Sequence, residues 1–361
     1  FTAAFHHNFN KAHDLKLLLG ASRETLDHQT LSAERSNYAY PEYQTIDAGA
    51  DDEYKQTGGS RSQWALQSFF GRFNYNYKER YLFEANVRFD GSSRFAPGNR
   101  WGIFPSFSAA WRVTEEPFML NIKNTLTELK VRASYGTLGN QNIGSDYYPT
   151  IQSLTISSMA ANGIIYPIVG LNGMANKDIT WETNTNFNAG IDFEILRGKV
   201  SGTVEYFYRK TSDMLFWFTV PASLGYGGYY DNIGDMRNHG IEFSTNVNIM
   251  RRRNLDWNAY FNFTHYTNKI TMLPEERKTR TVEGYEGYAS GTRFYGEGLP
   301  MYTFLIPEYR GVSDDGQSQW WYKVQKTDKE GNLMVDDNGN PVTDEMGNPK
   351  MQFDAANAAK N

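Results

Sequence analysis

The run of residues 81–90 alternates between apolar and polar side chains, and this alternation limits the possible folds more than any other feature of the chain. Its odd positions are Tyr, Phe, Ala, Val and Phe, and its even positions after Leu82 are Glu, Asn, Arg and Asp. Successive side chains of a β-strand point to opposite faces, whereas a helix would spread these two sets around its circumference. The run therefore predicts a strand with one apolar face and one polar face.

The same two-residue period recurs along most of the chain. Comparable runs occupy residues 69–77, 129–136, 186–195, 241–249 and 257–264. We expect further strands at residues 1–5, 15–21, 103–113 and 200–208. The sequence thus predicts an all-β chain of about ten or eleven antiparallel strands, by counting the segments that follow this period.

The composition agrees with strands that have two different faces. Aromatic residues make up 15% of the chain, yet its mean hydropathy is −0.62. No stretch of 18 consecutive apolar residues occurs, so we expect no transmembrane helix. The strands of a membrane barrel have a much weaker hydropathy signal, because only every second side chain faces lipid.

The connections between the expected strands alternate in length. Short ones lie at residues 10–13, 78–80, 196–199 and 250–255, with a medium one at 114–127. Long ones cover residues 31–62, 90–100, 139–180, 211–240 and 267–300. Transmembrane barrels combine tight periplasmic turns with long extracellular loops. We therefore predict an antiparallel transmembrane β-barrel segment, with a large soluble β-sandwich as the alternative.

Aromatic residues lie where a membrane barrel would place its two interfacial girdles. Tyr75, Tyr77 and Tyr81 flank one short turn, and Trp111 and Trp257 lie near others. Trp101 and Trp181 mark points where long connections rejoin strands. Amphipathic rings collect at both membrane interfaces, so we expect these residues in the girdles.

Two sets of residues are candidates for contact with a transported molecule. The first is aromatic and lies in the connection 211–240, where it would either stack on a ligand or pack loop against loop: Trp217, Tyr226, Tyr229 and Tyr230, with Phe216 beside them. The second is charged, would face the lumen, and would either line the route or pair internally: Glu84, Arg88, Lys130, Arg132, Asp192 and Glu194.

Signatures of enzymatic chemistry are missing from the sequence. The chain has no cysteine, its six histidines have no helical metal-ligand spacing, and adjacent His6 and His7 would point to opposite faces. Gly58-Gly59-Ser60 lacks the Lys-Ser/Thr ending of a phosphate-binding loop. Net charge is −5 and no basic stripe suggests nucleic acid. We expect no enzyme, no metal and no cofactor.

The last fifty residues differ from the rest. Residues 312–361 contain nine acidic residues against five lysines, and the turn sequences at 336–341 and 346–349 are rich in Asn, Gly and Pro. We predict barrel strands and extracellular loops over residues 1–310, and an acidic extracellular hairpin excursion over 311–361.

Three blocks of sequence resemble a known family. They are GRFNY, YLFEANVRFD, GSSRF and RWGIFPS within residues 71–106, SYGTLGNQ at 134–141, and NIG with NHGIE within 232–242. In this order, and over most of residues 69–266, they are similar to the barrel strands of SusC/RagA-type TonB-dependent transporters.

The resemblance implies a 22-stranded barrel in the outer membrane of a Gram-negative bacterium, with an N-terminal plug inside it. It implies energy coupling through TonB, ExbB and ExbD, and a SusD-like surface lipoprotein as a lid. The imported class would be oligosaccharides or oligopeptides. The plug, the TonB contact motif and the final strands are not recognised here, so we expect a fragment. A passive porin, a soluble surface glycan-binding β-protein and a barrel enzyme are the rival interpretations.

Overall fold

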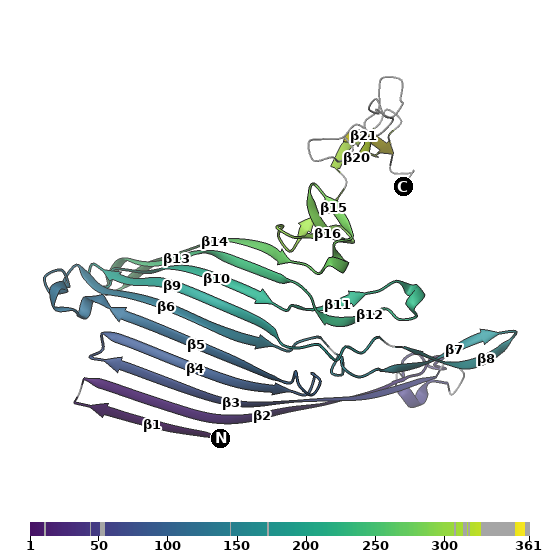
Figure 1. The fold of residues 1–361 in the computed structure, drawn as a ribbon, viewed down its shortest axis with the longest axis horizontal. Helices are drawn as coiled ribbons and strands as arrows, with labels where there is room; N and C mark the ends of the chain where they lie inside the picture. Colours follow the sequence, from purple (N-terminus) through teal and green to yellow (C-terminus); the bar gives the residue numbers. More distant parts are fainter. Residues whose placement is uncertain are drawn as a thin grey trace. The chain divides into compact units, whose positions relative to one another are not determined.

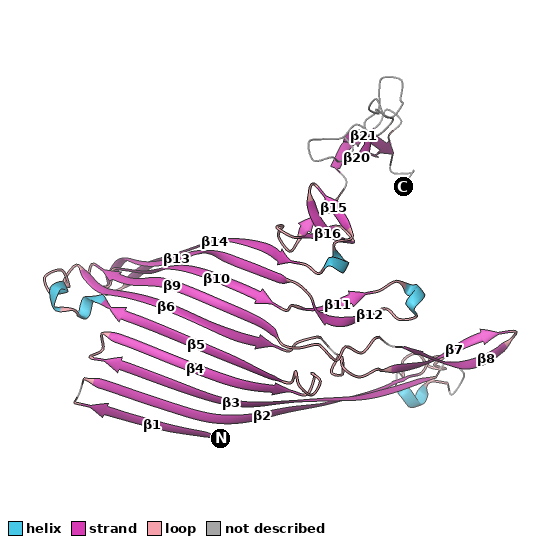
Figure 2. Ribbon diagram, viewed as in Figure 1, coloured by secondary structure: helices cyan, strands magenta, loops and turns pink. Residues whose placement is uncertain are grey.

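A computed structural model of the chain describes residues 1–10, 12–43, 45–50, 55–144, 146–171, 173–306, 308–312, 316, 318–325 and 351–357. The chain divides into two compact units. The first contains Phe1–Thr279 and Gly296–Met301, and the second contains Arg280–Tyr295 and Tyr302–Asn361. Strands dominate both units, and the helical segments are single 3-10 turns (Figure 2).

The first unit is built on one ten-stranded antiparallel sheet (Figure 1). In spatial order its strands are β1 (Thr2–Phe9), β2 (His13–Glu34), β3 (Gln56–Tyr77), β4 (Tyr81–Ser92), β5 (Trp101–Arg112), β6 (Leu126–Asn140), β9 (Glu182–Ile195), β10 (Val200–Ser212), β13 (Asp235–Arg252) and β14 (Leu255–Met272). The prediction of an all-β antiparallel chain with about ten long strands is confirmed. Within the described residues the sheet is open, because β1 and β14 each have one neighbour.

The register aligns the apolar positions of neighbouring strands on one face. Phe69 lies opposite Phe89, and Phe89 lies opposite Ile103. These side chains remain largely exposed, as do Phe107 and Phe261 elsewhere on that face. An apolar face that no protein atoms cover is what a barrel wall presents to lipid.

Tight turns join the strands at one end of the sheet. Lys78 and Glu79 connect β3 to β4 with φ values of 54° and 58°, and Leu196 and Arg197 repeat this between β9 and β10. Two consecutive positive φ values match the right-handed twist of an antiparallel hairpin. The predicted short connections at residues 78–80 and 196–199 are therefore confirmed.

The longer connections contain more strand than the sequence predicted. The interpretation of residues 31–62 as a loop is wrong at both ends, because β2 continues to Glu34 and β3 begins at Gln56. Beyond the membrane both faces of a strand meet water, so the alternation that reveals a strand is no longer required there. The connection after β6 contains the hairpin β7 (Leu154–Ala161) and β8 (Ile164–Leu171). The connection after β10 contains β11 (Leu215–Thr219) and β12 (Gly228–Asn232).

The short helical segments all lie in connections. They are η1 (Ile46–Ala48), η2 (Val113–Glu115), η3 (Pro117–Met119), η4 (Ala222–Leu224) and η5 (Glu275–Arg277). No helix in the described part of the chain is long and apolar enough to cross a membrane.

The second unit is formed from short strands. One sheet contains β15 (Arg280–Val282), β16 (Tyr285–Ser290), β17 (Arg293–Gly296) and β18 (Thr303–Phe304), and another contains β19 (Glu308–Val312), β20 (Ser318–Gln325) and β21 (Met351–Asn357). The turn sequences noted at residues 336–341 and 346–349 lie outside the described residues. The predicted boundary at residue 310 stays a prediction.

Candidate functional site

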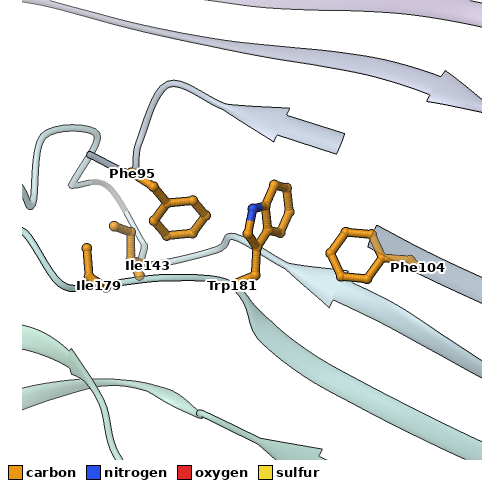
Figure 3. Packing of buried hydrophobic residues seen from close by; sticks show 5 residues of the cluster. All are labelled: Phe95, Phe104, Ile143, Ile179 and Trp181. Carbon is orange, nitrogen blue, oxygen red and sulfur yellow. The ribbon is translucent and has the colours of Figure 1, made fainter. Parts of the chain in front are cut away.

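A small hydrophobic core holds the connections together at the end of the sheet opposite the tight turns. Phe95, Phe104, Ile143, Ile179 and Trp181 pack against one another there (Figure 3). Phe104 belongs to the inner, otherwise polar face of β5. Its ring covers the backbones of Gly102 and Gly139, where any Cβ atom would collide with it. The glycines thus make room for an aromatic ring on the inner face of the wall. We call the cluster of these five hydrophobic residues the rim core.

Trp181 corrects one expectation from the sequence. Its side chain is 6% exposed and its Nε1 donates a hydrogen bond to the carbonyl oxygen of Arg100, 2.9 Å away. It therefore belongs to the rim core and not to an interfacial girdle. Trp101 does lie on the outer face, where it is 53% exposed and stacks on Phe69 with ring centroids 6.1 Å apart.

Arg94 joins three segments beside this core, and the sequence alone did not single it out. Its guanidinium lies over the ring of Trp64, 5.4 Å from the centroid, and over Tyr147 at 4.8 Å. Its Nη1 donates to the carbonyl oxygen of Gln141. Burial lowers the pKa of Arg94, which is 6% exposed. The planar cation stacks on both rings and ties the connection after β6 to β3.

Next to Tyr147 the connections enclose a cavity of about 410 Å³. Its lining comes from β3, from the connection between β6 and β9, and from the β11–β12 hairpin: Ser62, Asp146, Tyr147, Tyr148, Pro149, Ile151, Ser153, Gly173, Met174, Trp217, Tyr229 and Tyr230. We call this the aromatic pocket. Clefts of this size that combine aromatic rings with polar groups can bind small ligands.

Three of the four aromatic residues singled out in the sequence lie in this pocket. Trp217 and Tyr230 pack edge to face with centroids 5.0 Å apart. Tyr229 also touches the pocket, but its ring packs on Phe218, with centroids 5.1 Å apart, on the other face of the hairpin. Tyr226 is not part of the lining, and its hydroxyl donates to the sulfur of Met174 at 3.2 Å. Binding by these residues stays a prediction. The lining from the 146–153 segment, Tyr148 included, was not predicted.

The β11–β12 hairpin is fixed by its own register and by the segment before β9. Trp217 pairs with Tyr230 in the ladder. Asn176 Nδ2 donates to Asp231 Oδ1 at 2.8 Å, and Asn232 exchanges hydrogen bonds with the Thr180 backbone at 2.8 and 3.0 Å. Two polar side chains therefore hold the aromatic wall in place.

Two tyrosine hydroxyls of the pocket, those of Tyr229 and Tyr230, have a raised pKa and are neutral donors at physiological pH. Burial raises the pKa of Tyr230, and the nearby Asp146 carboxylate raises it further. Burial likewise raises the pKa of Tyr229. The site therefore offers flat rings, hydroxyl groups and one carboxylate, a set suited to a polar organic ligand with flat or aliphatic surfaces.

The six charged residues predicted to face the lumen lie on the polar face of the sheet, and three of them, Lys130, Arg132 and Asp192, pair with one another. Asp192 accepts hydrogen bonds from Lys130 and Arg132, both at 3.2 Å. Arg88 pairs with Asp90 at 2.8 Å. These contacts favour the interpretation of internal pairing along a polar wall.

Glu84 and Glu194 differ in their surroundings. Glu84 accepts hydrogen bonds from Asn74 and from Asn86, the latter at 2.8 Å. Glu194 lies directly opposite Glu128 in the ladder and lines an open hollow of about 520 Å³ on the same face.

Among the described residues, no group of three or more His, Cys, Asp and Glu side chains is arranged to hold a metal ion.

Comparisons with known proteins agree with this architecture. The family model described as TonB dependent receptor-like, beta-barrel matches residues 1–348. TonB-dependent receptor SusC of Bacteroides thetaiotaomicron is 37% identical over 211 residues, covering 58% of this chain and 21% of that receptor. TonB-dependent receptor P3 of Formosa agariphila is 31% identical over 314 residues, covering 84% and 30%.

A solved structure of the RagAB peptide transporter matches with a TM-score of 0.76 at 25% identity, over 88% of this chain and 34% of that one. The chain thus spans about a fifth to a third of the length of these relatives. Receptors and transporters make up the family, in agreement with the expectation that the chain is not an enzyme. The chain belongs to the TonB-dependent receptor β-barrel family of the outer membrane of Gram-negative bacteria, and it is similar to SusC.

Proposed function

We propose that the protein actively imports oligosaccharides or oligopeptides across the outer membrane. In this proposal a SusD-like lipoprotein covers the outer end, and TonB with ExbB and ExbD supplies the energy. The aromatic pocket carries the proposal, because it gathers stacking surfaces and hydroxyl donors at the end of the sheet with the long connections. Such loops are extracellular in outer-membrane barrels, so a nutrient would meet the pocket first.

Each face of the sheet has a part in this function. The apolar face, with Phe107 and Phe261, anchors the wall in lipid. The opposite face presents the paired charges around Asp192 to the lumen. Because these charges satisfy one another, a polar solute that passes along the wall meets hydrogen-bonding groups without a strong net field.

Growth of a deletion strain complemented with variants tests the proposal. Trp217→Ala removes the largest stacking surface of the pocket and should reduce uptake of the cognate oligomer about tenfold or more at limiting concentration. Leu224→Ala is the matched control, because Leu224 is 54% exposed in the same connection and does not line the pocket. Equal uptake by both variants contradicts the assignment of the pocket.

Energy dependence separates the importer from a passive porin. An uncoupler that collapses the inner-membrane proton gradient should stop uptake by the wild-type strain, because active import depends on TonB. Uptake that continues unchanged after uncoupling contradicts active import and favours the porin. For the strains with Trp217→Ala and Leu224→Ala, immunoblotting of outer-membrane fractions checks that both variants reach the membrane in equal amounts.

A further inference from the structure

Among the described residues, the outer half of β3 has a strand on only one side. Its ladder with β4 ends at the pair Leu66 and Ser92. Its ladder with β2 continues for ten more residues, to the pair Glu34 and Gln56. In Figure 1, β2 and β3 continue together beyond the end of β4. From Gln56 to Ala65, β3 is therefore an edge strand.

Hydrogen bonds identify the backbone groups that face this edge. The Ala65 N–H donates to Ser93 Oγ, and the Ser93 N–H donates to the Ala65 carbonyl oxygen, both at 2.9 Å. The Gln63 N–H donates to the hydroxyl of Tyr148 at 2.8 Å. Residues of an antiparallel strand alternate between their two neighbours, so the odd-numbered residues face the edge.

Three residues continue this odd-numbered series. The N–H and C=O groups of Thr57, Gly59 and Arg61 point to the same edge and have no hydrogen-bond partner among the described residues. Their spacing is about 6.8 Å for every second residue of an extended strand. An extended peptide presents its own N–H and C=O groups at this same repeat and can therefore pair with them.

The edge lacks the features that prevent strand addition. Proteins usually protect such edges with lysine, proline or a β-bulge. The register of β2 with β3 has no bulge here, and residues 56–65 contain neither lysine nor proline. The one charge, Arg61, is neutralised by a two-point contact with Asp27, with N···O distances of 2.6 and 3.0 Å. An edge without a bulge, a proline or an unpaired charge favours pairing with another extended chain.

The edge also leads to the aromatic pocket. Ser62 lies between the edge-facing residues Arg61 and Gln63 and lines the pocket. Tyr148 also lines the pocket, and its hydroxyl accepts the hydrogen bond from the Gln63 N–H. We infer that the edge of β3 from Thr57 to Gln63 binds an extended oligopeptide by strand addition, with one peptide side chain in the aromatic pocket. This inference rests on the proposed import function and selects oligopeptides from its two substrate classes. If each residue from Thr57 to Gln63 pairs with one residue of the peptide, the bound segment is about seven residues long.

Alternate N-methylation of a peptide tests the inference without changing the protein. The intact protein in detergent is titrated with a fluorophore-labelled heptapeptide of alternating valine and threonine that contains one phenylalanine. Two further versions are N-methylated on alternate residues, in opposite phase. Strand addition predicts that one phase binds at least about tenfold more weakly, because it loses its ladder donors, and that the other keeps most of the affinity. No saturable binding of the parent peptide, or equal binding of all three peptides, overturns the inference.

A protein variant provides the complementary measurement. Gly59→Pro removes the N–H group in the middle of the edge, between those of Thr57 and Arg61. It removes no N–H group that bonds to β2, so peptide binding should weaken about tenfold or more while the β2–β3 ladder keeps its hydrogen bonds. Gly59→Ala keeps the N–H and is the matched control. Unchanged peptide affinity in Gly59→Pro, with loss of a co-purifying partner protein, would assign the edge to that partner and overturn the inference. Energy-dependent saccharide uptake by the wild-type strain would also overturn it, while leaving the proposed import function intact.

Discussion

At the scale of single residues, one glycine allows an ion pair to cross a strand. Arg132 on β6, Gly190 on β9 and Glu205 on β10 lie in one row across three strands. The guanidinium passes over the glycine, and Arg132 Nη2 lies 2.5 Å from Glu205 Oε2. Glu205 also lies directly opposite Glu242, so this contact offsets a repulsion between like charges.

Gly190→Val should break this crossing. A Cβ at residue 190 would already lie 3.1 Å from the guanidinium carbon of Arg132, so a branched side chain displaces the cation. We expect a loss of about 1–2 kcal/mol in the free energy of unfolding, allowing for the partial exposure of the pair. Urea unfolding of the protein refolded into lipid vesicles measures it. Ala189→Val places the same valine side chain on the outer face and should cost little. An equal loss in both variants would contradict the role of Gly190 in this ion pair.

At the scale of elements, the β11–β12 hairpin decides the shape of the pocket. Its ladder brings Trp217 against Tyr230. Gly228 ends this ladder so close to the neighbouring strand that a Cβ would collide with the carbonyl oxygen of Phe218. The hairpin therefore depends on a glycine that does not itself line the pocket.

Gly228→Ala should separate the two strands and disturb the Trp217 wall. We expect ligand affinity to fall about tenfold while the barrel remains folded, since the collision is confined to the hairpin. Gly227→Ala is the matched control, because a Cβ at that position meets no atom within 4 Å. Ligand-dependent quenching of tryptophan fluorescence measures the affinity, and equal affinities for the two variants would contradict this role of Gly228.

The outer half of the β2–β3 hairpin depends on the pair formed by Asp27 and Arg61. About ten strand residues suffice to cross the membrane, so Asp27 lies beyond that part of β2. Hydrogen bonds from Arg61, and then from Gln63, lower the pKa of Asp27 to about 2. A lowered folded-state pKa gives a stabilisation that is complete above the unfolded pKa of about 4 and is lost as the pH falls toward 2.

Hydrogen–deuterium exchange tests this pH dependence. After correction for the intrinsic rate, exchange in β2 beyond Arg23 should stay constant from pH 8 to pH 5 and rise below about pH 4. Asp27→Asn should exchange faster at neutral pH and lose the rise in acid. A wild-type rise that already occurs near pH 6 would contradict this role of Asp27.

At the scale of the whole molecule, the two faces of the sheet contact different surroundings: the apolar face contacts lipid and the polar face contacts water. Phe107 and Ser108 are neighbours on β5, and their side chains point to opposite faces. Phe107 is 49% exposed on the apolar face, and Ser108 lines the inner wall. This separation explains how a chain with a polar mean hydropathy forms a membrane wall.

Phe107→Arg places a charge on the lipid-facing side. We expect a cost of about 2–4 kcal/mol in the free energy of unfolding from lipid vesicles. Ser108→Arg introduces the same side chain on the lumen side and should cost much less. If the inner variant were the more damaging of the two, the assignment of the faces would be reversed.

The sequence by itself determined the strands, their two faces and the tight turns. Each depends on residues close together in the chain: alternate side chains meet lipid or water, and the turn between β3 and β4 needs only two residues. The charged residues of the inner wall followed from the same alternation, and Asp192 and Arg132 lie where it placed them.

Only the tertiary structure decided how the connections pack. Trp181 lies in the rim core because it packs against Phe95, a residue far away in the sequence, and Tyr148 reaches the edge of β3 at Gln63. Strand extensions beyond the membrane need no alternation, so the free edge of β3 left no pattern in the sequence. Local chemistry fixes a barrel strand, whereas a binding site at the rim depends on contacts between distant segments, which no short run of residues encodes.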